Sequence, residues 1–395
     1  MDEHPEEQAR KTAIQLHNDG IPPVEIYTRL DRSKRWFFKW LRRYRSGDAE
    51  WYKEHSRAPA RVLNKTPESI EKSILMARNK LESSKYAQIG SLAIQWELKS
   101  MGIEPPPTWT IDRVLKRSDA VREKKKYKPS AKAYPDVKLT FSESIQQADL
   151  LGPRYIKNDG RFYSMNVLDT QSYLAAINPC RTKGDDDIAR GLLRSWKTIG
   201  LPDYLQLDNE LSFRGSNRHP RSLGLVLRMC LALGVQVIFI PVAEPWRNGL
   251  VEKFQDVFDK SFYRRQFFVS FDHLKKEAKV FEKFRNNNHR CTGIHGRTPA
   301  QHIRTEGIKT EKLDSDVRLK SIDLSLADGY IHLIRFIRSD LKLGIFSEKF
   351  KMPKSIQYEY VIATICSETH QLQVRIGGQI VEAFEYKVPF EYSSD

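Results

Sequence analysis

Three short apolar runs, each followed by an acidic residue, constrain the fold of this 395-residue chain more than any other feature. The runs cover residues 144–150, 204–207 and 235–242. The acids at or after their ends are Asp149, Asp208 and Glu252. Open α/β sheets build their sites at strand ends, and three converging carboxylates suit two divalent cations, because Mg²⁺ prefers hard oxygen ligands. The pattern therefore predicts an α/β sheet that carries phosphodiester chemistry.

The residues around these acids form three motifs: Gln147-Ala-Asp149, Leu205-Gln-Leu-Asp208-Asn209 and Glu244-Pro-Trp-Arg-Asn248-Gly249-Leu-Val-Glu252. Together they resemble the catalytic core of DDE transposases of the retroviral-integrase superfamily, in particular the integrase-core transposases of bacterial insertion sequences. The resemblance runs from about Ala148 to Arg304. It implies a ribonuclease H-like fold and a triad of the three acids that is both catalytic and metal-binding. It also implies two Mg²⁺ ions, for which Mn²⁺ substitutes, and transfer of element ends into target DNA.

Two features depart from the family pattern. Glu210 stands where the family commonly has glycine after Asp-Asn, and the gap from Asp208 to Glu252 is longer than usual. The polar stretch 214–222 has the composition of a loop insertion, which would account for the extra length. Glu210 thereby becomes a rival metal ligand.

The composition favours a polyanionic partner. Lys and Arg number 66 against 50 Asp and Glu, which gives a net charge of +16 and a pI near 9.5. Nucleic acid is the leading polyanion because phosphate neutralisation and counterion release drive such binding. A merely basic soluble protein has the same composition and is the alternative. We expect double-stranded DNA, as element ends and as target, to be the partner.

Cysteine usage and hydropathy indicate a cytoplasmic protein. The four cysteines are scattered, without the spacing of a zinc site or a disulfide framework. The longest apolar run, 235–240, is far too short to span a bilayer, and the chain opens without a signal-peptide pattern. We expect a bacterial, nucleoid-associated protein of three or four domains that has no membrane partner.

The first 50 residues predict a helix-turn-helix. Apolar spacing indicates helices over about 7–18 and 24–30, and Ser33 is a candidate cap for a third helix over 34–45. The expected core residues of the third helix are Trp36, Phe37, Trp40 and Leu41. The basic residues expected to face DNA are Lys34, Arg35, Lys39, Arg42, Arg43 and Arg45. A small helical bundle with a solvated basic face is the alternative.

Residues 65–120 predict a second helix-turn-helix. Its helices are expected to begin near Thr66-Pro67, Ser91 and Thr108, and two tandem readers would lengthen the DNA footprint. The candidate DNA contacts on its last helix are Arg113 and Lys116. A basic linker follows over 121–136, and its candidate phosphate contacts are Lys124, Lys125 and Lys126. A plainly solvated linker is the alternative.

Residues 137–306 predict the ribonuclease H-like catalytic core with a mixed sheet. The expected strands cover 137–141, 144–150, 162–168, 173–178, 204–207 and 235–240, and the expected helices cover 185–199, 222–233, 248–266 and 271–288. The helix that starts at 248 buries Val251, Phe254 and Phe258 and leaves Glu252 on another face. Asp169 is a fourth acid, for which a turn role is the better explanation.

Two residues next to the third motif have alternative roles. Trp246 and Arg247 flank the acids, where they would stack on or clamp a nucleotide as DNA-binding residues. Packing of Trp246 on the edge of the sheet is an equally good interpretation.

Residues 324–395 predict a small β-barrel. The expected strands cover 331–337, 341–346, 358–366, 371–376 and 379–384, with a Gly377-Gly378 turn between the last two. The family resemblance implies an SH3-like barrel that contacts DNA or another subunit. The fold class is therefore multidomain, with all-α helix-turn-helix units, an α/β core and a C-terminal barrel.

The function predicted from these features is metal-dependent DNA cleavage and strand transfer by a transposase or integrase. A catalytically silent, domesticated transposase that only binds its sites is the first alternative, and a ribonuclease H-type nuclease is the second. Joining two element ends requires at least a dimer on DNA, so we expect a homo-oligomer. The need for a helper ATPase stays open.

Overall fold

The computed structural model describes residues 5–54, 66–120, 134–135, 141, 144–215, 221–325 and 328–389. The chain divides into two compact units, Met1–Pro67 and Glu68–Asp395. The predicted linker contacts Lys124, Lys125 and Lys126, and most of the expected strand 137–141, lie outside the described residues. No helix in the described part of the chain is long and apolar enough to cross a membrane.

The first unit contains the predicted helix-turn-helix. Its helices are α1 (Pro5–Asn18), α2 (Pro23–Arg29) and α3 (Lys34–Arg45). The Ser33 hydroxyl caps α3 by accepting a hydrogen bond from the Trp36 N–H at 3.1 Å. Phe37, Trp40 and Leu41 are buried as expected, whereas Trp36 is only half-buried. The three helices share one small apolar core, which fixes the angle between them.

The second group of helices has its own core and is also attached to the rest of its unit. It comprises α4 (Glu68–Ser83), α5 (Ser91–Ser100) and α6 (Thr108–Arg117). Ile74, Ile94 and Ile111 are fully buried between them. After α4, Tyr86 enters the apolar cluster that α11 (Gly249–Ser261) and α12 (Phe271–Asn288) form with the central sheet, and its carbonyl lies 2.6 Å from His289 Nε2. These helices therefore belong to the same compact unit as the core.

The central sheet has the predicted mixed arrangement. Its first five strands are β1 (Ile145–Ile156), β2 (Gly160–Asp169), β3 (Ala175–Cys180), β4 (Tyr204–Leu207) and β5 (Gln236–Phe239). Strands β1, β2 and β3 are antiparallel neighbours, and β4 and β5 continue the sheet in parallel on the other side of β1. This order is that of a ribonuclease H-like fold.

Helices cover both faces of this sheet because its strands alternate two sets of apolar side chains. On β2, Met165 and Val167 pack with α8 (Asp185–Ile199) and α10 (Leu225–Ala232) in one cluster. Phe162 and Leu168 pack in the other cluster, with α11 (Gly249–Ser261) and α12 (Phe271–Asn288). The remaining short helices of this region are α9 (Leu211–Arg214), η1 (Pro245–Asn248), η2 (Tyr263–Arg265), η3 (Thr292–Ile294) and α13 (Pro299–Glu306).

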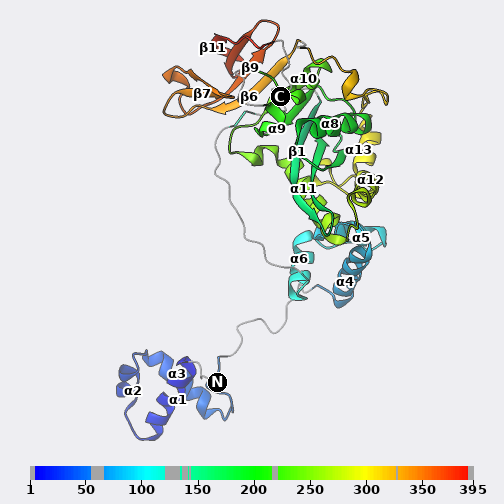
Figure 1. The fold of residues 1–395 in the computed structure, drawn as a ribbon. Helices are drawn as coiled ribbons and strands as arrows, with labels where there is room; N and C mark the ends of the chain where they lie inside the picture. The colour runs from blue at the N-terminus through cyan, green and yellow to red at the C-terminus, as the bar shows by residue number, and fades with distance from the viewer. Residues whose placement is uncertain are drawn as a thin grey trace. The chain divides into compact units, whose positions relative to one another are not determined.

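The C-terminal region corrects one prediction. Its elements are η4 (Leu319–Ser321), β6 (Tyr330–Phe336), β7 (Lys342–Ile345), β8 (Glu348–Lys351), η5 (Lys354–Ile356), β9 (Tyr360–Cys366), β10 (Gln371–Ile376) and β11 (Gln379–Glu385). The predicted strands are present, but they do not form a separate barrel. Strand β6 pairs in parallel with β5, with Val237 opposite Ile331, and β9, β10 and β11 follow. Figure 1 shows β6, β9 and β11 in the same part of the molecule.

The physical reason lies at the edge of the core. Without β6, the outer edge of β5 would leave backbone N–H and C=O groups without strand partners. Pairing with β6 satisfies them and produces a nine-stranded sheet in the order β11-β10-β9-β6-β5-β4-β1-β2-β3. Strands β7 and β8 form a separate two-stranded hairpin. Sequence alternation predicts strands, but it does not identify the partner of each strand.

Candidate active site

The sheet brings two of the three predicted acids onto neighbouring strands, with Asp149 inside β1 and Asp208 directly after β4. Gln147 on β1 is paired with Gln206 on β4 in a parallel register. Asp149 and Asp208 each stand two residues after one of these glutamines, so both acids lie beside the carboxyl end of β4. Glu252 comes from the first turn of α11, the helix that packs over β1 and β2. The fold therefore places the three predicted acids in one region.

The pKa values of all three carboxylates are raised. Burial raises the pKa of Asp149 to about 6, with further increases from the charges of Asp208 and Glu252. Burial also raises the pKa of Asp208, with a contribution from Glu210, and burial raises that of Glu252. None of the three acids forms an ion pair with a described Lys or Arg. A nearby positive charge would stabilise all three carboxylates.

The polar contacts of the acids are few. Asp149 Oδ1 accepts a hydrogen bond from the Leu150 N–H at 2.8 Å, and its Oδ2 accepts one from Gln255 Nε2 at 2.7 Å. Asp208 Oδ1 accepts a hydrogen bond from the Glu210 N–H at 3.0 Å. As the side chains stand, no three His, Cys, Asp or Glu residues in the described chain segments are grouped closely enough to hold a metal ion.

Three buried amide side chains position the acid-bearing segments. Asn248 Nδ2 donates to the Ala148 carbonyl at 3.0 Å, and Asn248 Oδ1 accepts from Gln206 Nε2 at 3.2 Å. Gln147 Oε1 accepts hydrogen bonds from two N–H groups in the first turn of α11, those of Leu250 at 3.1 Å and Val251 at 3.2 Å. These contacts tie the start of α11, the helix that carries Glu252, to both β1 and β4.

Gln147, Gln206 and Gln255 were not among the residues predicted from the sequence to belong to the site. A signal for the first two was present, because each stands two residues before a predicted acid and therefore on the same face of its strand. Gln255 stands three residues after Glu252, which places it on the same side of α11.

Other predicted residues near the site have partners elsewhere. Glu210, the rival ligand, lies 3.3 Å from Lys183 Nζ in an ion pair. Asp169 accepts three hydrogen bonds in its own turn, from the Ser172 N–H at 2.6 Å, the Ser172 hydroxyl at 2.7 Å and the Gln171 N–H at 3.2 Å. The interpretation of Asp169 as a turn residue is therefore confirmed.

The two residues that flank the third motif differ from each other. Trp246 is 56% exposed, so its ring is not buried against the sheet. Arg247 is already engaged: its Nε donates to Glu244 at 3.0 Å, and its guanidinium lies 3.7 Å from the centre of the Tyr134 ring. A nucleotide contact stays a prediction for both residues, and Trp246 is the freer of the two.

The predicted DNA-facing residues of α3 also fall into two groups. Lys34, Arg35 and Arg42 are exposed and form no ion pair with any described acid. Lys39 is paired with Glu54 at 2.9 Å, and Arg43 donates to the Lys53 carbonyl at 2.9 Å. On α6, Arg113 lies over the exposed Trp109 ring, and Lys116 is exposed. Their contacts with DNA stay predictions.

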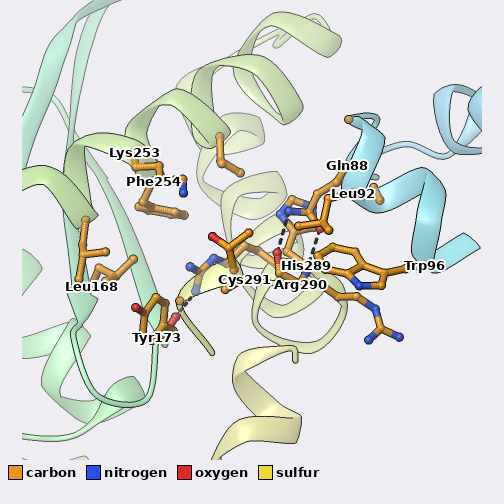
Figure 2. A pocket seen from close by; sticks show the side chains of 17 residues that line it. Gln88, Leu92, Trp96, Leu168, Tyr173, Lys253, Phe254, His289, Arg290 and Cys291 are labelled. Carbon is orange, nitrogen blue, oxygen red and sulfur yellow. Dashed lines mark hydrogen bonds between the residues drawn. The ribbon is translucent and has the colours of Figure 1, made fainter. Parts of the chain in front are cut away.

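A separate cavity of about 310 Å³ lies between the second helical group and the core (Figure 2). Trp96 and Leu92 of α5 line one side, and Phe254 of α11 lines the other. The buried Arg285 donates to the Tyr173 carbonyl and packs 5.0 Å from the Phe254 ring centre. The three acids do not line this cavity, so it is distinct from the candidate active site.

Comparison with known protein families identifies the N-terminal helices. Residues 4–51 match the family model of the homeodomain-like domain. The first unit is thus a homeodomain-like helix-turn-helix, and that motif binds DNA in the proteins that define it. No curated protein matches the chain.

Solved integrase catalytic cores are similar to part of this chain. The HTLV-2 integrase catalytic core domain in complex with magnesium has 16% identity and a TM-score of 0.30, and the match covers 40% of this chain and 93% of that domain. The catalytic core domain of BIV integrase has 16% identity and a TM-score of 0.30, with 41% and 95% covered. The strand order β3-β2-β1-β4-β5 is what shows the ribonuclease H-like fold.

Proposed function

We propose that the protein is a DDE polynucleotidyl transferase that cleaves DNA at the ends of a mobile element and joins them to target DNA. One observation carries this proposal. Three carboxylates from β1, the end of β4 and α11 share one region, each with a raised pKa and none with a basic partner among the described side chains. Half-buried acids that lie close to one another are costly unless a cation or a reaction uses them.

The donor set fits Mg²⁺ or Mn²⁺, because it consists of hard carboxylate oxygens whose negative charges the protein leaves unbalanced. Asp149, Asp208 and Glu252 would hold the metal. Bound there, divalent ions supply activation of a water or a DNA 3′-hydroxyl and stabilisation of the leaving 3′-oxygen. Release of Gln255 from Asp149 Oδ2 would free the second oxygen of that carboxylate for such binding.

The other residues of the chain orient the reactants in this proposal. The hydrogen bonds of Asn248, Gln147 and Gln206 would hold the three acid-bearing segments in fixed positions relative to one another. Trp246 would stack on a base beside the acids, and the exposed basic residues of α3 would contact the phosphate backbone of the element end. Pairing of two element ends would require a homo-oligomer on DNA.

The test is strand transfer on DNA that carries the flanking element's ends, with Mg²⁺ or Mn²⁺. We expect joining by the wild type, and loss of joining with retained DNA binding in Asp208→Asn and in Glu252→Gln. Asp256→Asn is the matched control, because this exposed acid lies one turn beyond Glu252 on α11. Binding without chemistry by the wild type, across both metals and cognate ends, would instead support the silent DNA-binding protein.

A further inference from the structure

A buried arginine of the C-terminal strands reaches the segment that carries Asp208. Arg335 on β6 is 7% exposed, and it donates from Nη2 to Asn209 Oδ1 at 2.7 Å. Its other donors serve three carbonyls, those of Ile240 at 3.0 Å, Ile334 at 2.9 Å and Gly344 at 3.2 Å. The guanidinium is planar with a fixed fork of donors, so it holds these acceptors in one geometry.

Asn209 completes a closed set of contacts beside the site. It follows Asp208 directly, and its Nδ2 donates to the Ile240 carbonyl at 2.7 Å. The same carbonyl accepts from Arg335. The end of β5, the segment after β4 and β6 are therefore joined by three mutually linked hydrogen bonds, one residue away from a predicted catalytic carboxylate.

A second C-terminal strand holds the segment that leads to Glu252. The Tyr360 hydroxyl on β9 donates to the Glu244 carboxylate, with its oxygen 2.7 and 2.9 Å from the two acceptor oxygens. Glu244 in turn accepts from Arg247 Nε at 3.0 Å, and the Arg247 guanidinium lies 5.7 Å from the Tyr360 ring centre. This segment continues through Asn248 into the first turn of α11.

We infer that Arg335 and Tyr360 are positioning residues for the active site, and that the C-terminal strands form part of its framework. This inference rests on the proposed function. Two of the three acid-bearing segments are anchored from β6 and β9, which pair with the core through the β5–β6 ladder. The C-terminal region is thus required to align the acids, in addition to any contact that it makes with DNA or another subunit.

The first test compares two buried arginines by substitution with lysine in the full chain. Arg335→Lys retains the charge and loses the fork, and we expect a 10–100-fold lower rate of single-turnover cleavage, the size typical of residues that orient metal ligands. Arg228→Lys is the matched control, because Arg228 is also buried and donates to three carbonyls, those of Leu223, Leu324 and Pro389. Its rate should stay within about twofold of the wild type. Equal losses in both variants would overturn the inference.

The second test asks whether Arg335 acts through Asn209. In a double-mutant cycle, Asn209→Ala and Arg335→Lys should each lower the rate, and the double variant should be no slower than the worse single variant. Multiplicative losses would mean that the two residues act independently and would overturn the assignment. Tyr360→Phe removes only the hydroxyl contact with Glu244, so it tests the second anchor in a chain that keeps its packing, and we expect about a 10-fold loss.

Amide hydrogen exchange separates this inference from the proposed function, because it needs no catalysis. In Arg335→Lys, exchange over residues 207–213 should be about 10-fold faster than in the wild type, and in Arg228→Lys it should be unchanged. If the wild type proves inactive but this difference appears, the proposed function fails and the anchoring stands. If exchange over 207–213 is unchanged in Arg335→Lys, the anchoring itself is wrong.

Discussion

Asp149 and Asp169 are two acids on neighbouring strands of the same sheet, and burial raises the pKa of both, but their neighbours differ. Asp169, at the end of β2, is 5% exposed, and its Oδ1 accepts three hydrogen bonds from its own turn. Asp149, on β1, faces two further carboxylates and a single side-chain amide. A charged group that the fold satisfies locally stabilises a turn, whereas one that the fold leaves beside like charges is available for a ligand or a reaction.

Substitution of these two acids should have very different effects on the rate of strand transfer, and this is the largest difference that we expect. We expect Asp149→Asn to lower strand transfer by more than about 100-fold, since even residues that only orient metal ligands account for 10–100-fold. Asp169→Asn keeps an Oδ1 that can accept the same three hydrogen bonds, so its rate should stay within about twofold of the wild type. Strand-transfer assays at equal DNA occupancy would measure both. Comparable losses in the two variants would remove the contrast between them.

The pH dependence of stability should sharpen the contrast. The pKa of Asp149 is raised to about 6 from an ordinary value of 3.8, so the folded state binds more protons than the unfolded state between pH 4 and 6. Protonated Asp149 therefore contributes to the free energy of unfolding at low pH, and this contribution is lost as the pH rises through 6. Asp149→Asn should remove this loss and be more stable than the wild type at pH 7 by about 2–3 kcal/mol.

Urea unfolding of the wild type, Asp149→Asn and Asp256→Asn from pH 4 to pH 7 measures this difference. Asp256→Asn removes an acid from the exposed face of α11 and should follow the wild-type curve. An Asp149→Asn curve that runs parallel to the wild type over the whole range would show that this carboxylate is not strained in the folded protein.

The sequence predicted local structure well and long-range partners poorly. The order of strands and helices from 144 to 288, the buried stripe of α11 and the turn role of Asp169 follow from periodicity and capping, which depend on neighbours in the chain. The pairing of β6 with β5 and the contact of Arg335 with Asn209 depend on residues about a hundred positions apart. Strand alternation places Arg335 on the same face as the buried Ile331, Leu333 and Ile337, so the local pattern indicates its burial but not its partner Asn209.

Binding of a divalent cation should stabilise the acids and leave the Asp169 turn unaffected. At ten times its Kd, Mg²⁺ or Mn²⁺ would raise the free energy of unfolding by about 1.4 kcal/mol. Thermal unfolding with and without metal would show this increase in the wild type and in Asp169→Asn, and its loss in Asp208→Asn. A metal-induced increase that survives in Asp208→Asn would place the metal elsewhere in the protein.

The smallest expected effect concerns the basic residues of α3, where a residue without intramolecular partners is compared with one that has them. Arg42 is exposed and has no acidic partner in the described residues, whereas Arg43 donates to the Lys53 carbonyl at 2.9 Å and lies 4.7 Å from the Trp40 ring centre. If a residue left unpartnered by the fold is the one that meets DNA, Arg42→Ala should weaken binding and reduce the slope of log Kd against log salt concentration by about 1. Arg43→Ala should instead lower the stability of the N-terminal unit and leave that slope nearly unchanged.

Fluorescence anisotropy with duplex DNA over a salt series measures the slope, and thermal unfolding measures the stability. The opposite assignment of the two effects would show that Arg43 leaves its intramolecular partners to bind DNA, so that local satisfaction does not separate structural from functional charges in this helix.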